Sequence, residues 1–82
     1  LMHRTHGADL LTEALETRRQ VDVAAALSRR LGRTIYQATI SSWASGRNVP
    51  RGVAIVALQE ELGIPFVAWS QPSAEPPIKA AG

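Results

Sequence analysis

The segment Gln37-Ala-Thr-Ile-Ser-Ser-Trp-Ala-Ser-Gly46 decides the fold that we predict for this chain. Ile40 and Trp43 have i, i+3 spacing, so on a helix they share one buried face. An ordinary solvent-facing helix would carry Lys and Glu pairs on its other face. Here that face is short, uncharged and rich in hydrogen-bonding groups: Gln37, Ala38, Ser41, Ser42 and Ser45. Such a face suits close approach to another polar surface, such as the base edges of the DNA major groove.

The residues that follow this helix form a cationic loop. Gly46 can take the left-handed conformation that ends a helix, and Pro50 prevents the helix from continuing. Arg47 and Asn48 lie between them. We therefore interpret residues 37–48 as a DNA-recognition helix that is followed at once by a phosphate anchor.

The charged residues are unevenly distributed along the chain. The net charge is only +2, yet no acidic residue lies between Val23 and Gln59. Five arginines fall in that interval: Arg29, Arg30, Arg33, Arg47 and Arg51. A run of this kind is either a solvated cationic face or a surface that contacts phosphates. Because the arginines bracket the neutral polar helix, we favour phosphate contact.

The composition excludes several classes of protein. With 82 residues, of which 45% are hydrophobic and 20% charged, the chain predicts one small globular domain. It has no cysteine, which excludes a disulfide framework and a thiolate zinc site. The two histidines, His3 and His6, have no partner for a metal or for a nucleophile–base pair, and no nucleotide-binding glycine motif is present. We predict no enzyme activity, no metal and no cofactor.

Glycine and proline divide the chain at helix-length spacing, and no stretch alternates with the period of a strand. We predict an all-α domain of five short helices, over residues 8 to 18 or 19, 21 to 30 or 31, 37–45, 49 or 50 to 62, and 64–69. The domain occupies residues 8–70, between a flexible N-terminus (residues 1–7) and a proline-rich, flexible tail (residues 71–82). No apolar run approaches the roughly 20 residues of a membrane span, so we predict a cytoplasmic protein.

The predicted core follows from the apolar face of each helix. The first two helices contribute Leu10, Leu11, Ala14, Leu15, Val23, Ala24, Leu27 and Leu31. The fourth, which is the most apolar, contributes Val53, Ile55, Val56, Leu58 and Leu62. Phe66 and Trp69, at i, i+3 spacing, are expected to cap the core, and Ile35 to fill the gap between two helices.

With its two central helices placed, the chain resembles the phage-repressor, or Cro-like, helix-turn-helix family, also called the xenobiotic-response-element class. The matching residues are Gln20-Val-Asp-Val-Ala24, Leu27, Gly32, Ile40-Ser-Ser-Trp-Ala-Ser-Gly46, Pro50 and Leu62-Gly-Ile64. The resemblance covers residues 8–70. It implies a five-helix, lambda-repressor-like domain, in which the second and third helices form the helix-turn-helix.

The sequence departs from the family pattern at three points. Residues 28–31 lengthen the link between the two central helices by about one helical turn before the glycine. Tyr36 stands where the family has a capping Ser or Thr, so either Thr34 supplies the cap or the first turn is irregular. Ala44 replaces a glutamate that is common after the tryptophan.

The resemblance also implies the residues that contact DNA. The base-reading positions fall on Gln37, Ala38, Ser41 and Ser42. The phosphate-binding candidates are Gln20, Arg33, Thr34, Arg47, Asn48 and Arg51. Gln20 can equally be a simple helix-terminus residue.

The implied function is a sequence-specific, repressor-like transcriptional regulator that binds double-stranded DNA as a homodimer on a palindromic operator. The dimer contact is expected at the fifth helix with the tail, or at the end of the fourth helix. The alternative is a protein-interaction module of the same fold, such as the folded part of an antitoxin. The C-terminal tail would then bind the protein partner.

Overall fold

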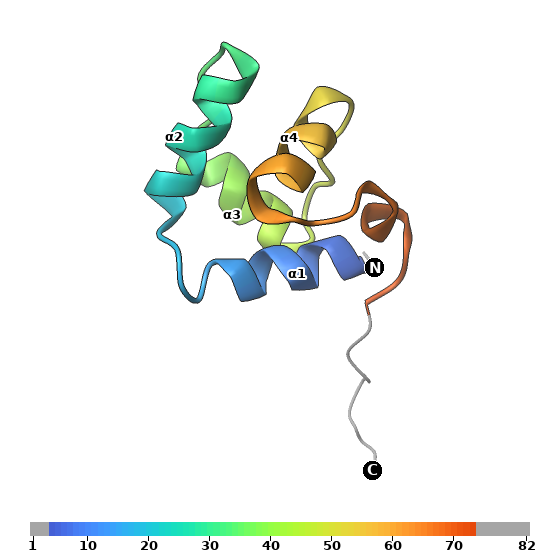
Figure 1. Cartoon of the computed structure of the whole chain (residues 1–82). Coiled ribbons are helices and arrows are strands. Elements are labelled where there is room, and N and C mark those ends of the chain that lie inside the picture. The colour runs from blue at the N-terminus through green and yellow to red at the C-terminus, as the bar shows by residue number, and fades with distance from the viewer. Residues whose placement is uncertain (1–3, 74–82) are drawn as a thin grey trace.

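The computed structural model describes residues 4–73 of the chain. Within them lie four α-helices and one 3-10 helix: α1 (His6–Ala14), α2 (Gln20–Leu31), α3 (Gln37–Ser45), α4 (Val53–Leu62) and η1 (Phe66–Ser70) (Figure 1). This part contains no strand, only an isolated antiparallel bridge between Thr5 and Pro72. The all-α prediction is confirmed, with a 3-10 helix in fifth position. No helix in residues 4–73 is long and apolar enough to cross a membrane.

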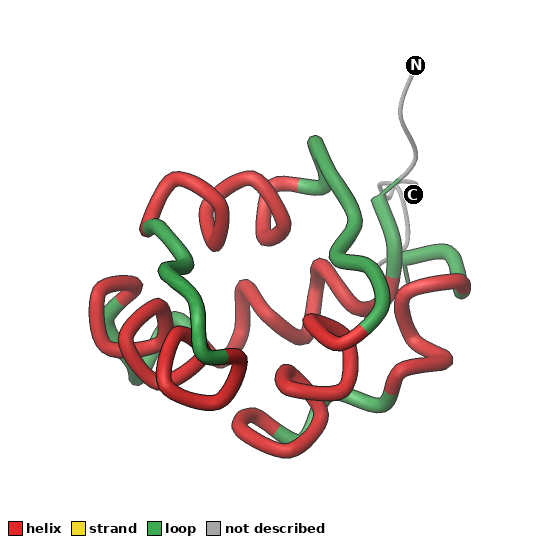
Figure 2. The backbone as a smooth tube through the Cα atoms, turned by 90° about the horizontal axis from the view of Figure 1, so that it is seen from above, coloured by secondary structure: helices red, strands yellow, loops and turns green. Residues whose placement is uncertain are grey.

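The helices form a closed ring of contacts around one core. α1 packs against α3 and η1, α2 packs against α3 and α4, and α4 contacts η1. Short loops join the elements (Figure 2). Each element contributes one large, almost fully buried side chain: Leu11, Leu27, Ile40, Leu58 and Trp69. Full burial of a leucine or isoleucine contributes about 1.5–3 kcal/mol, so the core draws on every element.

α1 begins earlier than the sequence predicts. It starts at His6 rather than at Ala8, because the Thr5 hydroxyl caps it by accepting the Ala8 N–H at 3.1 Å. Residues 4–7 are therefore part of the domain, where the sequence predicted a flexible end.

α1 also ends earlier, at Ala14 rather than at Arg18 or Arg19. The N–H groups of Thr17 and Arg18 both donate to the Ala14 carbonyl, at 3.3 and 3.1 Å. The Thr17 hydroxyl donates to the same carbonyl at 3.3 Å. These local bonds replace the helical pattern by a turn.

α4 differs from its prediction in its start and in its buried face. It begins at Val53 rather than at residue 49 or 50, because Gly52 precedes it in a non-helical conformation (φ 58°, ψ −129°). The core-facing side chains are Ala54, Ala57 and Leu58. Val53 and Val56, which were predicted to be in the core, are 63% and 52% exposed. The first six residues of α4 are all apolar, so they offer no pattern from which the buried face can be selected.

The aromatic cap of the core consists of one side chain, that of Trp69, and not of two. Trp69 is 5% exposed, whereas Phe66, its predicted partner, is 63% exposed. Gly7 of α1 lies beneath Trp69 so closely that a Cβ atom at residue 7 would fall 2.3 Å from Cδ2 of the indole. The indole fills the space over this glycine, and Phe66 is left at the surface.

Residues 71–73 lie antiparallel to residues 4–6. Two backbone hydrogen bonds, of 2.8 and 3.0 Å, join the two segments. The start of the tail that was predicted to be flexible over residues 71–82 is thus bonded to the domain. The rest of that tail, residues 74–82, lies outside the residues that the structure describes, as do residues 1–3.

Candidate nucleic-acid interface

The two faces of α3 are chemically different. Ile40 and Trp43 point into the core and are 0% and 7% exposed. On the outer face Gln37, Ala38 and Ser45 are exposed, and Ser41 and Ser42 are half-buried. The division predicted from the spacing of Ile40 and Trp43 is confirmed. α3 therefore offers a short, neutral and polar surface to solvent.

A serine of α2 fixes the turn that leads into α3. The Ser28 hydroxyl donates to the Ala24 carbonyl at 2.7 Å and accepts the Ile35 N–H at 2.7 Å. Ile35 is partly buried and packs against the core, as predicted. This role of Ser28 was not predicted, because nothing in the neighbouring sequence distinguishes it from a solvent-facing serine.

No side chain caps the first turn of α3. Tyr36 is the N-cap residue, in an extended conformation, and the helix has no side-chain cap hydrogen bond. The suggestion that Thr34 supplies a cap is therefore wrong. The Tyr36 carbonyl accepts the N–H groups of Thr39 and Ile40 at 3.0 and 3.2 Å. The N–H groups of Gln37 and Ala38, which precede these two, have no acceptor within the helix and are available to water or to a ligand.

The C-terminal end of α3 is a compact turn. Gly46 ends the helix at φ 83°, a left-handed conformation that glycine adopts without strain. The Ser42 carbonyl then accepts the N–H groups of Arg47 and Asn48, at 3.0 and 3.3 Å. The Asn48 side-chain amide donates to the Ser42 hydroxyl. The hydroxyl keeps its proton to donate and the amide keeps its oxygen to accept, so the two side chains form one fixed polar unit.

The predicted run of arginines divides into paired and unpaired members. Arg29, Arg33, Arg47 and Arg51 are exposed and form no ion pair with any residue from 4 to 73. Arg30 instead bonds to two acids of α4: its Nε lies 2.7 Å from Glu61 Oε1 and its Nη1 lies 3.0 Å from Glu60 Oε1. The hydrogen bond from Arg30 lowers the pKa of Glu61, despite a smaller opposing effect of burial. Arg30 thus connects α2 to α4.

Arg4 forms contacts that no sequence pattern predicted. Its guanidinium donates from Nε to Asp9 Oδ1 at 2.7 Å, and from Nη1 to the Ala44 carbonyl at 2.9 Å. No spacing rule relates residue 4 to a carbonyl forty residues away, since the contact arises only when α1 packs against α3. Arg4 is thus a structural cation at the end of the candidate site.

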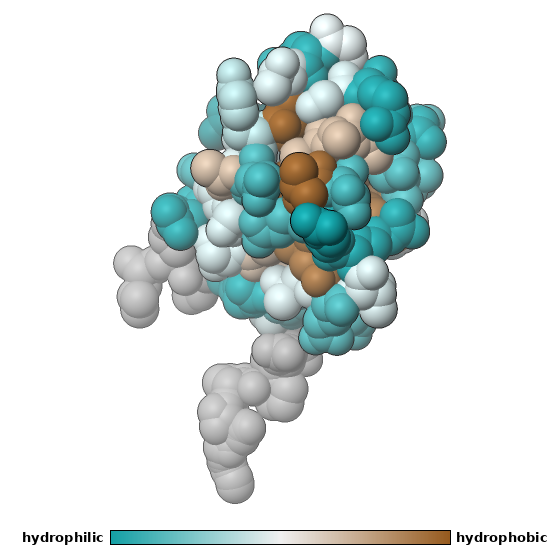
Figure 3. All heavy atoms as spheres, turned by 90° about the vertical axis from the view of Figure 1, so that its left-hand side faces the viewer, coloured by the Kyte–Doolittle hydropathy of each residue, from teal (hydrophilic) through white to brown (hydrophobic). Residues whose placement is uncertain are grey.

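The remaining predicted contacts lie around α3. Gln20 is the first residue of α2 and is half-buried, Arg33 and Thr34 are exposed in the turn before α3, and Arg51 is exposed in the loop before α4. α2 packs against α3, and the loops that hold Arg33, Thr34 and Arg51 flank α3 in the chain. Figure 3 views the molecule from the side on which α2 lies in Figure 1. Hydrophilic residues cover most of this face, with apolar residues exposed between them (Figure 3).

No protein-family model, curated protein or solved structure matches this chain. The assignment of a function therefore rests on the geometry of the site. Within residues 4–73 no three His, Asp or Glu side chains lie close enough together to hold a metal ion. His3, one of the two histidines, lies outside this range.

Proposed function

We propose that this protein is a sequence-specific, double-stranded DNA-binding regulator of transcription, a repressor that acts in the cytoplasm and reads the major groove with α3. We assign it a lambda-repressor-like fold, in which α2 and α3 form the helix-turn-helix and η1 is the fifth helix. One observation carries the proposal: the outer face of α3 is short, neutral and polar, and unpaired arginines flank it in the chain.

The exposed groups of α3 have the chemistry needed to read base edges. Gln37 can form a bidentate contact with adenine, worth about 1–3 kcal/mol of discrimination, and Ala38 can offer its methyl group to thymine. Ser41 supplies a further hydroxyl. The unit formed by Ser42 and Asn48 presents a donor and an acceptor in fixed geometry. Such side chains specify sequence, because they face bases rather than phosphates.

The surroundings of α3 have the chemistry needed to bind phosphates. Three exposed guanidinium groups without an ion pair among residues 4–73, those of Arg33, Arg47 and Arg51, lie in the loops that flank α3. The open N–H groups in the first turn of α3 favour an anion, since they lie at the positive end of the helix dipole. Gln20 and Thr34 are candidates for further neutral contacts. These groups would position α3 without reading sequence.

We further propose a homodimer on a palindromic operator, with half-sites roughly 34 Å apart. The two predicted dimer surfaces are not equivalent. η1 exposes Phe66 and Val67, by 63% and 48%, whereas the end of α4 exposes Gln59 and Glu60. We therefore favour η1. Light scattering tests the oligomeric state, and a monomer that stays monomeric on DNA would remove the palindrome.

The test of the proposed function is selection from random-sequence duplex DNA with the wild type, Gln37→Ala and Arg47→Ala. We expect the wild type to enrich one motif, and the Gln37→Ala variant to relax it at one base pair by about 1–3 kcal/mol. The Arg47→Ala variant should weaken binding to all sequences alike, because phosphate contacts carry no sequence information. Absence of any enriched motif would contradict the proposal.

A second function is favoured by one feature of the surface. A groove of about 380 Å³ runs between α2 and α4, and it is lined by Arg30, Leu31, Val53, Val56, Ala57 and Glu60. An exposed apolar groove with a charged rim is typical of a protein-interaction module. A Val56→Ser variant tests this alternative, which predicts loss of a protein partner with DNA binding unchanged.

A further inference from the structure

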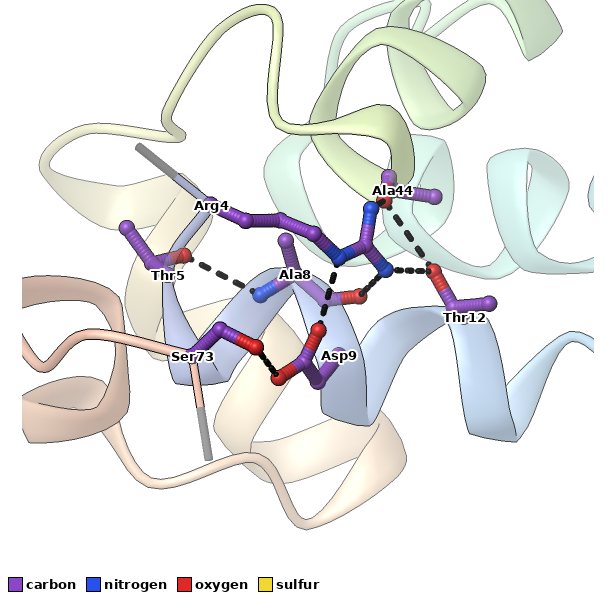
Figure 4. A network of polar contacts seen from close by, with 7 residues as sticks. All are labelled: Arg4, Thr5, Ala8, Asp9, Thr12, Ala44 and Ser73. Atoms are coloured by element: carbon purple, nitrogen blue, oxygen red, sulfur yellow. Dashed lines mark hydrogen bonds and ion pairs between the residues drawn. The ribbon is translucent and has the colours of Figure 1, made fainter. Parts of the chain in front are cut away.

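Residues 4–6 and 71–73, which we call the strap, join the two ends of the described chain beside α3. The Ser73 N–H donates to the Arg4 carbonyl at 3.0 Å, and the His6 N–H donates to the Gln71 carbonyl at 2.8 Å. The Ser73 hydroxyl also donates to Asp9 Oδ2 (Figure 4). The strap is therefore closed by backbone and side-chain bonds together.

Arg4 connects the strap to the last turn of α3. Its Nη1 donates to the Ala44 carbonyl at 2.9 Å, and its Nη2 donates to the Thr12 hydroxyl at 2.8 Å (Figure 4). Thr12 in turn donates to the same Ala44 carbonyl at 3.0 Å. This carbonyl is among the last four of the helix, which have no intrahelical partner. Arg4 satisfies it and places a cation at the negative end of the helix dipole.

Arg4 contacts the turn that ends α3, and Arg47, the candidate phosphate anchor, follows directly in the chain. A Cβ atom at Gly46 would lie 3.3 Å from Cγ of Arg4, so the arginine stem packs against this glycine. Arg4 and Arg47 line the same surface hollow of about 350 Å³, together with Ser45 and Gly46. The position of the Arg47 loop is thus bounded on one side by Arg4.

We infer that the strap fixes the conformation of the last turn of α3 and of the Arg47 loop. Opening the strap would therefore lower the affinity of α3 and this loop for DNA. The inference rests on the proposed function. Asp9 links the two segments of the strap, because one of its carboxylate oxygens accepts a hydrogen bond from Arg4 and the other accepts one from Ser73. Loss of Ser73 removes one partner of Asp9 and one backbone bond of Arg4. Any event that separates the two segments of the strap therefore regulates α3 without touching it.

The test uses the full chain with Ser73→Pro, which removes the N–H donor to Arg4 and the hydroxyl donor to Asp9. We measure amide hydrogen exchange at Arg47 and Asn48. Both amides should exchange about fivefold faster or more, the factor that corresponds to one net hydrogen bond. The matched control is Gln71→Ala, which changes an exposed side chain and keeps the carbonyl that bonds to His6.

Arg4→Met is the second variant, because it keeps the stem against Gly46 and removes the donors to Ala44. Exchange is referred to the Leu27 amide of α2, so that local opening is distinguished from global unfolding. Unchanged exchange at Arg47 and Asn48 in both variants, or protection at these two amides equal to that of Leu27, would overturn the inference.

DNA affinity is measured separately, on the motif that the wild type selects. Both strap variants should bind it about fivefold more weakly, and Gln71→Ala should bind as the wild type does. Faster exchange with unchanged affinity would overturn the regulatory part of the inference. If the wild type binds no DNA, the proposed function fails, whereas the exchange rates still decide whether the strap and α3 are coupled.

Discussion

The side of α3 that faces α1 and the side that faces solvent use their polar groups in opposite ways. On the α1 side, the Arg4 guanidinium bonds to a carboxylate, a hydroxyl and a helix-end carbonyl. On the solvent side Gln37 is exposed, and Arg47, which lines the same hollow as Arg4 just beyond the end of the helix, forms no ion pair with any residue from 4 to 73. Of these two arginines, only Arg4 is therefore bonded within the fold.

The largest effect on stability is expected from Gly7→Ala, which changes the contact between α1 and η1. An alanine in a helix normally stabilises by about 1 kcal/mol relative to glycine. Here the new Cβ would fall 2.3 Å from the Trp69 ring, so we expect a loss of about 3 kcal/mol from overpacking, measured by urea unfolding. Gly32→Ala is the control, since nothing lies within 4 Å of its Cβ position and only its positive φ is strained. A stabilised Gly7→Ala variant would contradict the close contact.

The same substitution, Arg to Met, is expected to have different effects on stability at Arg4 and at Arg47. Arg4→Met should lower the free energy of unfolding by about 2 kcal/mol, because it leaves Asp9 and the Ala44 carbonyl short of a partner. Arg47→Met should change it by less than about 0.5 kcal/mol, as a surface substitution without a partner in the fold. Thermal and urea unfolding of the two variants give both values. Equal effects would mean that the two sides do not differ.

The smallest effect is expected at the Arg30–Glu61 pair, which joins α2 to α4 at the surface. The pKa of Glu61 is lowered in the folded protein by the hydrogen bond from Arg30. The pair therefore stabilises the fold above the ordinary pKa of glutamate, and this contribution is lost as pH falls through the lowered value. The difference in melting temperature between wild type and Glu61→Gln should be small near neutral pH and vanish in acid. A difference that grows in acid would contradict this sign.

The sequence was sufficient for the elements whose pattern is one-sided. The spacing of Ile40 and Trp43 predicted α3 with its observed bounds, Gln37–Ser45, and predicted which of its faces is buried. Gly32 marked the end of α2 correctly. These features are local, since a helix period and a left-handed glycine do not depend on the rest of the fold.

The sequence was insufficient where a choice depends on tertiary packing. The first six residues of α4 are all apolar, so its exposed valines, Val53 and Val56, could not be distinguished from its core residues. Arg30 was counted with the free cations, because its acidic partners lie thirty residues away in sequence. Arg4 was assigned to a flexible end for the same reason, since its partner Ala44 belongs to another helix.

In the proposed function, the unpaired side chains of Arg33, Arg47 and Arg51 hold DNA phosphates. The most direct test is the salt dependence of binding to the selected DNA, for the wild type and for Arg33→Gln/Arg47→Gln/Arg51→Gln. Each phosphate contact contributes a slope of about −0.9 in log K against log salt, so loss of three contacts should flatten the slope by about 2.7, with the melting temperature unchanged. A slope equal to that of the wild type would contradict the claim and would favour a protein partner for this surface.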